Sequence, residues 1–196
     1  MKRKVLVIDD HLPSKTFLLR GLTERGFAVV GEGASGKDAV RLANTIVPDV
    51  VLMAVGLSDV DGISAAREIM EANPLPIILL TSHYDTETIE RAKATGVMGY
   101  LIKPLREEEL NPAIELAISR FAEFVSLRRE NEDLRKALEA RKTIERAKGI
   151  LMKQQGLSET QAFSLIQKKS MDMRKSMVEI AQAIILTEEI TKEKTS

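Results

Sequence analysis

Two adjacent carboxylates, Asp9 and Asp10, directly follow a short apolar segment at residues 5–8. They would repel one another unless a cation held them, and carboxylate oxygens are ligands that Mg²⁺ prefers. An acidic pair at the start of a loop is also common as a solvated turn or a helix cap, so the pair alone leaves both interpretations open. Thr81 and Lys103 end two further apolar segments. A hydroxyl and an ammonium group beside two carboxylates suit a small oxyanion, so we predict one pocket for Mg²⁺ and a phosphoryl group.

The elements that must position these residues repeat along the first 120 residues. Short segments, most of them rich in β-branched residues, predict strands over 5–8, 28–30, 50–55, 77–81 and 99–102. Amphipathic segments predict helices over 13–25, 36–46, 62–72 and 85–94, with another from residue 107 onward. This alternation predicts an α/β fold, a doubly wound five-stranded parallel sheet with helices on both faces.

Segment 50–55 is apolar at every position, which is typical of a central strand that is buried on both faces. In an open sheet of this kind, ligands bind at the carboxyl ends of the strands. We therefore expect five residues to meet at one edge of the sheet, namely Asp9, Asp10, Ala54, Thr81 and Lys103.

Composition excludes several classes of protein. The 196 residues include 29 basic and 29 acidic side chains, with 44% hydrophobic residues, which indicates a folded globular protein. The absence of cysteine excludes disulfides, thiolate nucleophiles, iron–sulfur clusters and zinc sites with sulfur ligands. The longest apolar run, 50–55, is too short to span a bilayer, and no signal peptide precedes the first strand. We therefore expect a cytoplasmic protein with no membrane partner.

The chain beyond Pro112 is expected to be helical, because it contains no further proline and glycine only at positions 149 and 156. Apolar residues there recur at spacings that alternate between three and four positions, which is the heptad repeat of a coiled coil. This pattern predicts a coiled coil over residues 121–140. An asparagine at its central a position favours a parallel homodimer in fixed register. Two heptads are short, however, so a single amphipathic helix packed on its own chain is the alternative. The predicted dimer contacts are Phe124, Leu127, Asn131, Leu134 and Leu138.

Capping signals divide the rest of the helical region. Gly156 predicts a helix end, and Ser158 with Gln161 predicts the capping box of a second helix. A third helix is expected to begin near residues 173–176. The polar residues 191–196 are expected to form a disordered tail.

Residues 3–120 resemble the receiver domain of bacterial two-component response regulators. The resemblance is carried by the strings VLVIDD (5–10), PDVVLMA (48–54), DG (61–62), LLTS (79–82) and GYLIKP (99–104). It implies a flavodoxin-like receiver over residues 1–120 and a histidine kinase as partner. It also implies that Asp9 and Asp10 bind Mg²⁺, that Thr81 and Lys103 contact the phosphoryl group, and that Thr81 and Tyr100 form a conformational switch.

One departure from the family pattern decides the chemistry. Ala54 stands where the family has its phosphoacceptor aspartate, so no carboxylate is present there to attack a phosphoryl donor. The resemblance then implies a receiver that is not phosphorylated at this position and that binds Mg²⁺ more weakly. A natural pseudo-receiver and a substituted acceptor are both consistent with the sequence. The sequence contains no other set of residues typical of a catalytic site, and we expect that the protein is not an enzyme.

Two other features could be mistaken for sites. Residues 31–37 match most of a phosphate-binding P-loop, but Asp38 replaces the residue that would ligate magnesium and would repel phosphate. His11 and His83 stand in predicted loops without partner patterns, so we expect surface histidines.

The neutral net charge conceals a basic C-terminal region. Residues 141–180 include nine basic and four acidic side chains. A surplus of this size is typical of nucleic-acid binding but also of solvated helix faces. Phe163 is the only aromatic residue there and is expected in the helical core together with Leu151 and Ile166, while Ala147 and Gly149 are expected to let helices approach closely. Stacking of bases on an aromatic platform is therefore not expected.

Residues from about 140 to 186 resemble the ANTAR domain, an RNA-binding module of transcription antitermination regulators, which implies an ANTAR domain over residues 141–190. The resemblance is carried by IERAKGILM (144–152), GLSETQAF (156–163) and VEIA (178–181). It implies that the protein dimerises and binds RNA hairpins in nascent leader transcripts. A DNA-binding response regulator and a pure interaction protein are the alternatives. The candidate phosphate contacts are Arg146, Lys148, Lys153, Arg174 and Lys175, and the last four are expected to be exposed.

Overall fold

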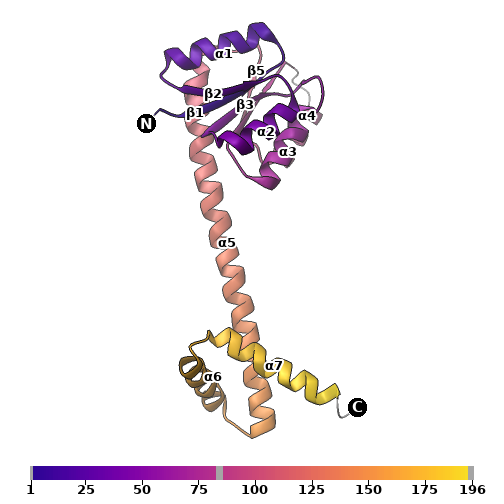
Figure 1. The fold of residues 1–196 in the computed structure, drawn as a ribbon, viewed down its shortest axis with the longest axis vertical. Coiled ribbons are helices and arrows are strands. Elements are labelled where there is room, and N and C mark those ends of the chain that lie inside the picture. Colours follow the sequence, from indigo (N-terminus) through magenta and orange to yellow (C-terminus); the bar gives the residue numbers. More distant parts are fainter. Residues whose placement is uncertain (1, 83–85, 194–196) are drawn as a thin grey trace. The chain divides into compact units, whose positions relative to one another are not determined.

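The computed structural model describes residues 2–82 and 86–193, with side chains through residue 190. The chain divides into two compact units, Met1–Ser126 and Leu127–Ser196. The first unit holds a sheet with surrounding helices, and the second holds helices only (Figure 1). Among the described residues, no helix has the length and apolar character needed to cross a membrane.

The sheet of the first unit has five parallel strands, as predicted. They are β1 (Lys4–Ile8), β2 (Ala28–Gly33), β3 (Val50–Ala54), β4 (Ile77–Thr81) and β5 (Gly99–Ile102). Their spatial order is β2-β1-β3-β4-β5, so β3 lies in the centre and pairs with β1 and β4. All five residues of β3 are buried, which agrees with the continuous apolar run in its sequence.

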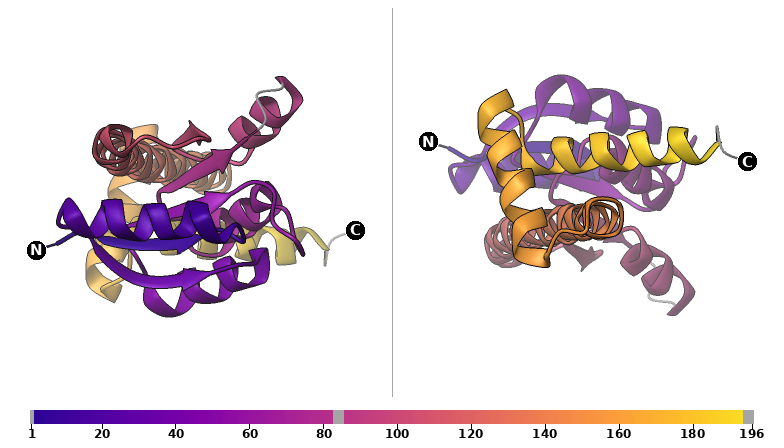
Figure 2. Two further views of the ribbon diagram at one scale, coloured as in Figure 1. Left: turned by 90° about the horizontal axis from the view of Figure 1, so that it is seen from above. Right: turned by 90° about the horizontal axis from the view of Figure 1, so that it is seen from below.

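Helices cover both faces of this sheet (Figure 2). They are α1 (Leu12–Glu24), α2 (Gly36–Ile46), α3 (Gly62–Ala72), α4 (Thr86–Ala94) and the first part of α5 (Glu107–Gln155). Leu6 and Ile8 of β1 face α2 and α3, whereas Val5 and Val7 face α1 and α5. This alternation is the period-two pattern that a strand between two apolar layers must show.

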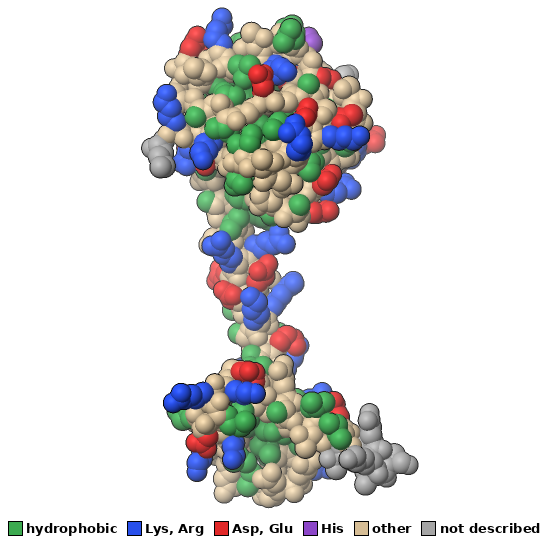
Figure 3. Space-filling view, in the orientation of Figure 1, with side chains coloured by type: hydrophobic (Ala, Val, Ile, Leu, Met, Phe, Trp, Pro, Cys, Tyr) green, Lys and Arg blue, Asp and Glu red, His purple; other side chains and the backbone are tan. Residues whose placement is uncertain are grey.

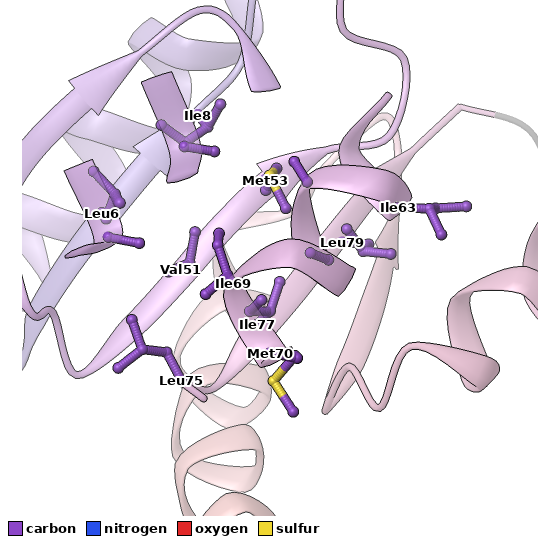
Figure 4. Packing of buried hydrophobic residues seen from close by; sticks show 14 of the residues in the cluster. Leu6, Ile8, Val51, Met53, Ile63, Ile69, Met70, Leu75, Ile77 and Leu79 are labelled. Carbon is purple, nitrogen blue, oxygen red and sulfur yellow. The ribbon is translucent and has the colours of Figure 1, made fainter. Parts of the chain in front are cut away.

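The larger core cluster lies between the sheet and helices α2 and α3. Figure 4 shows Val51 and Met53 of β3 beside Ile77 and Leu79 of β4, with Ile69 of α3 in the same cluster. All five side chains are almost completely buried. Because β3 and β4 are anchored in this way, the residues at their carboxyl ends have fixed positions.

A close backbone approach holds the loop after β3 against α3. A Cβ atom added at Gly62, the first residue of α3, would overlap the carbonyl oxygen of Ala54. The amide of Gly62 also donates a hydrogen bond of 2.8 Å to the carbonyl of Val55. Only glycine permits this contact, so the end of β3 and the start of α3 are in fixed register.

The second unit consists of the last part of α5 with α6 (Glu159–Met173) and α7 (Met177–Glu193). The right-hand view of Figure 2 shows α6 and α7 crossing beside α5, which is seen there along its axis. Its buried core consists of Ala147, Leu151, Ala162, Ile166, Ile180 and Ala181.

The capping box at Ser158 and Gln161 is present, and Gly156 ends α5 with a positive φ of 67°, as predicted. Two core predictions for this unit are wrong. Phe163 is 42% exposed, because the buried stripe of α6 passes through Ala162 and Ile166 instead. Gly149 has no neighbour within 4 Å of an added Cβ, whereas Ala147 is completely buried in the core.

The C-terminal tail was also predicted incorrectly in part. Helix α7 continues to Glu193, so residues 191–193 are helical rather than disordered, and residues 194–196 lie outside the described part. Helix α5 runs without a break through the expected boundaries near residues 120 and 140. Residues 126–139 of this helix are all exposed.

Candidate functional site

The carboxyl ends of β1, β4 and β5 bring three of the predicted site residues together. Lys103 Nζ donates a 2.6 Å hydrogen bond to Oδ2 of Asp9, whose carboxylate is completely buried. The other oxygen of Asp9 accepts a 3.0 Å bond from the amide of His11. The amide of Lys103 bonds at 2.7 Å to the carbonyl of Thr81, which places the end of β5 beside the end of β4.

An open cavity of about 650 Å³ lies over this edge of the sheet. Asp10 and Lys103 line it, together with Ser82 and with Gly56 from the loop after β3. Asp10 is exposed, whereas Thr81 is 8% exposed. The cavity therefore combines a carboxylate, an ammonium group and a hydroxyl, which is the donor set expected for a small oxyanion with a cation.

Ala54 is the last residue of β3 and is 2% exposed. It pairs with Leu80 of β4, whereas the pairing of β3 with β1 ends one residue earlier, at Met53. A methyl group at this position has no atom that can accept a phosphoryl group or bind a cation.

The residues present fit Mg²⁺ only in part. Asp9 and Asp10 are adjacent at the site, but one oxygen of Asp9 is already bonded to Lys103. Within residues 2–82 and 86–190, no group of three or more carboxylate, histidine or cysteine side chains is arranged to hold a metal. A cation would rest on two carboxylates at most and would need water to complete its coordination.

The predicted switch residues meet at a second, much smaller cavity of about 20 Å³. Thr81 and Tyr100 both line it, together with Ile89 of α4. Tyr100 is 46% exposed although it lines this cavity. Space for an inward ring position is therefore small in this conformation.

Sequence reasoning missed two carboxylates that organise the loop after β3. Asp59 accepts hydrogen bonds from the amides of Gly36 (2.7 Å) and Lys37 (3.3 Å), so it occupies the N-terminus of α2. The hydrogen bond from the backbone of Val60, with those from α2, holds the pKa of Asp59 below its usual value despite some loss of solvation. The P-loop-like string therefore has a protein carboxylate where a phosphate would bind, which agrees with its expected lack of function.

Asp61 is the second of these carboxylates and caps α3 through the amides of Ile63 and Ser64. Arg91 of α4 approaches the same carboxylate at 3.3 Å. His11 is an exposed N-cap of α1, as expected of a surface histidine, and His83 lies outside the described residues.

Most of the candidate phosphate contacts are exposed on the second unit. Lys153, Arg174 and Lys175 are exposed, and so is Arg146, which pairs with Glu189 at 2.7 Å. Figure 3 shows Lys and Arg side chains beside hydrophobic ones on this unit. The tight turn between α6 and α7 fixes Arg174 and Lys175, since Arg174 has a φ of 52° and the amide of Lys175 bonds to the carbonyl of Ser170.

The expectation that Lys148 is exposed is wrong. Its side chain is only 7% exposed, and Nζ lies 2.9 Å from Glu145 and 2.8 Å from Glu159. The hydrogen bonds that Lys148 donates to Glu159 and Glu145 raise the pKa of Lys148 and keep it charged. Lys148 therefore joins α5 to the first turn of α6 and is not available to a phosphate.

The predicted dimer contacts form an apolar stripe on the exposed part of α5. Leu127, Leu134 and Leu138 are between 53% and 64% exposed, and Asn131 is also exposed. Phe124 is 37% exposed and packs against Phe121, with ring centroids 6.3 Å apart. No described part of this chain covers the three leucines.

Family models match both units. The response regulator receiver domain matches residues 5–115, and the ANTAR domain matches residues 132–185. The transcriptional regulatory protein PdtaR of Mycobacterium tuberculosis is 42% identical over 139 residues, which cover 71% of this chain and 68% of that protein.

Solved receiver domains have the same fold as the first unit. The receiver domain of a modulated diguanylate cyclase from Desulfovibrio desulfuricans is 34% identical with a TM-score of 0.59, covering 62% of this chain and 98% of that one. A second match is the receiver domain of the sensor histidine kinase PA1611 from Pseudomonas aeruginosa, a structure with magnesium coordinated in its active site cleft. It is 30% identical with a TM-score of 0.56, and the match covers 61% of this chain and 99% of that one. The strand order, the edge that carries Asp9, Thr81 and Lys103, and both family matches lead to one conclusion: the chain belongs to the two-component response regulators that carry a receiver domain and an ANTAR domain.

Proposed function

We propose that this response regulator is an RNA-binding transcription antiterminator. Two copies associate through the apolar stripe on α5 and bind RNA hairpins in nascent leader transcripts, which prevents a terminator stem from forming. One observation carries the proposal. A set of exposed cations on the second unit has no carboxylate of the described side chains within 4.0 Å, namely Arg141, Lys153, Lys168, Lys169, Arg174 and Lys175.

Cations without partners favour binding to a polyanion. A lysine already paired with a carboxylate must break that pair before it contacts a phosphate, whereas an unpaired one exchanges only water and counterions. The cations lie at the end of α5, on α6 and in the turn before α7, so they belong to three parts of one small unit. Such a surface can contact several phosphates of a folded RNA at once, and loops display the unstacked bases that proteins recognise.

For the receiver we propose a state that does not depend on phosphorylation at position 54. The cognate histidine kinase has no carboxylate there to which it can transfer a phosphoryl group. Asp9 and Asp10 bind Mg²⁺ weakly, because Lys103 occupies one of the carboxylate oxygens. In this proposal, control of RNA binding passes through dimer formation rather than through an acylphosphate.

The test compares retention of full-length protein by an RNA hairpin, duplex DNA and a scrambled single strand at several salt concentrations. We expect preferential binding to the hairpin, with an affinity that falls steeply as salt rises. Preference for duplex DNA would show a DNA-binding regulator instead. Equal and weak retention by all three nucleic acids would overturn the proposal in favour of an interaction protein.

A further inference from the structure

A groove of about 380 Å³ lies between α6 and α7, against the end of α5. Its floor is apolar and comes from both helices, with Leu165 and Ile166 of α6 opposite Ile180 and Ile184 of α7. These side chains also belong to the core or pack against it, so the floor has a defined shape. The volume is in the range of sites that bind a small organic group.

Polar side chains surround this floor. Gln154 and Gln155 line the groove at the end of α5, and Lys169 and Lys175 line it on α6 and before α7. Neither lysine has a described carboxylate within 4.0 Å, but the charge of Lys175 adds to the hydrogen bonds from Ser176 in lowering the pKa of Glu179. Glu179 also lines the groove, but its carboxylate is bonded to the amide and hydroxyl of Ser176, both at 2.8 Å, where it caps α7.

We propose that this groove receives one unpaired base from the loop of an RNA hairpin, an inference that rests on the proposed function. The flat face of the base lies on the aliphatic floor, and Lys169 and Lys175 contact the phosphates on either side of it. Gln154 and Gln155 read the edge of the base, since a side-chain amide offers one acceptor and two donors. The module would thus recognise a base without any aromatic platform.

Charge favours RNA over an apolar peptide as the occupant. Lys168 and Arg174 are exposed next to the two groove lysines, so cations are concentrated around the groove. An RNA loop supplies both an apolar base face and phosphates on each side of it, which matches a floor of aliphatic side chains with a lysine at two edges. An amphipathic helix would cover the floor but would supply no regular anions for these lysines.

The position of Lys175 is fixed before any ligand binds. Arg174 ends α6 in the left-handed conformation, and its amide bonds to the carbonyl of Met171. The hydroxyl of Ser170 bonds to the carbonyl of Lys175. Because the turn is held by these bonds, binding need not order this lysine's backbone, which lowers the entropic cost of binding.

The experiment uses full-length protein and RNA hairpins that have a constant stem and a randomised loop. Hairpins that bind are selected, and each loop base of the tightest one is then removed in turn to leave an abasic site. We expect abasic replacement at one position to weaken binding by about tenfold or more, since a base edge read by two amides accounts for at least this factor.

Two pairs of variants then locate that base. Ala183→Phe fills the groove from α7, and its control is Gln182→Phe, the neighbouring exposed residue outside the groove. We expect Ala183→Phe to weaken binding of the intact hairpin about tenfold and to remove the effect of the abasic site on binding. Gln182→Phe should change neither the affinity for the intact hairpin nor the effect of the abasic site. Lys169→Gln against Lys142→Gln, an exposed lysine that is paired with Glu139 and is not among the proposed RNA contacts, repeats the comparison without adding volume. Thermal unfolding of each variant checks that the helices are intact.

The outcomes separate this inference from the function on which it rests. If no hairpin binds the unchanged protein, the proposed function fails. If hairpins bind but no abasic site matters, or if Ala183→Phe and Gln182→Phe bind alike, the groove inference is wrong and RNA binding by the unit stands. An apolar peptide would then be the better candidate for the groove.

Discussion

Nζ of Lys103, directly after β5, lies 2.6 Å from Oδ2 of Asp9, directly after β1. The carboxylate is completely buried and the lysine side chain is 20% exposed, so solvent screens the pair only weakly. Lys103 thus neutralises a carboxylate that would otherwise attract Mg²⁺. With Ala54 at its end, β3 supplies no carboxylate that could compete for this lysine.

Restoring a carboxylate at the end of β3 tests whether the pocket is otherwise intact. The unchanged protein, incubated with Mg²⁺ and a small phosphodonor, should carry no hydroxylamine-labile label at position 54. Ala54→Asp should acquire such a label and should bind Mg²⁺ more tightly by isothermal titration, because a third carboxylate joins Asp9 and Asp10. Failure of the variant to become labelled, with its fold intact, would show that the pocket has diverged beyond the single position.

Replacement of Asn131 tests the parallel dimer. Asn131→Leu should strengthen self-association in sedimentation experiments while admitting other registers or oligomers, because a buried asparagine lowers stability in exchange for specificity. Lys136→Leu, at an outer heptad position, is the matched control and should leave association unchanged. A monomer before and after the change would contradict the coiled coil.

Lys148 and Lys153 should differ in RNA binding although both belong to the basic region. Lys153→Gln should weaken binding to all hairpins alike and lower the slope of log affinity against log salt by roughly 0.7 to 0.9, because it removes one cation from the phosphate backbone. Lys148→Gln should instead lower the thermal stability of the helical unit, because it leaves Glu145 and Glu159 without their shared cation. An equal salt effect from both variants would show that Lys148 is accessible in solution.

Gly62 should tolerate no side chain. Gly62→Ala should destabilise the receiver by about 1–3 kcal/mol in denaturant titrations, since the added methyl group overlaps the carbonyl oxygen of Ala54. Gly99→Ala is the control, because a Cβ there has nothing within 4 Å. Equal stability of the two variants would mean that the loop after β3 can move away from α3.

Acid should weaken the contact between α3 and α4. Partial burial alone would raise the pKa of Asp61, but hydrogen bonds from Ser64 and Ile63 and the charge of Arg91 lower it below the ordinary 3.8. The ionised carboxylate therefore contributes stability that is complete above about pH 3.8 and is lost as the pH falls through the lowered pKa. Asp61→Asn should therefore make the free energy of unfolding depend less on pH in this range, as measured by urea unfolding at several pH values. An unchanged dependence on pH would contradict the stabilising role of the Asp61 carboxylate.

Local patterns predicted a large part of this protein. Strands β4 and β5 and helices α2 and α3 have the predicted bounds, because their apolar periods and their terminal residues are local signals. The capping box of Ser158 and Gln161 needs only four consecutive residues. The meeting of Asp9, Thr81 and Lys103 was also predicted, because the ends of parallel strands share one edge of the sheet.

Other features were decided by tertiary structure alone. Asp59 occupies the N-terminus of α2 from 22 or more residues away, and no local pattern signals a contact of that kind. Lys148 looks like a surface cation in the sequence, but in the structure it is buried and pairs with Glu159 of α6. Phe163 looks like a core residue, yet the helix turns its neighbours Ala162 and Ile166 inward. In each case the outcome depends on which segments meet in space, and local sequence determines how a helix forms but not the angle at which it packs on another.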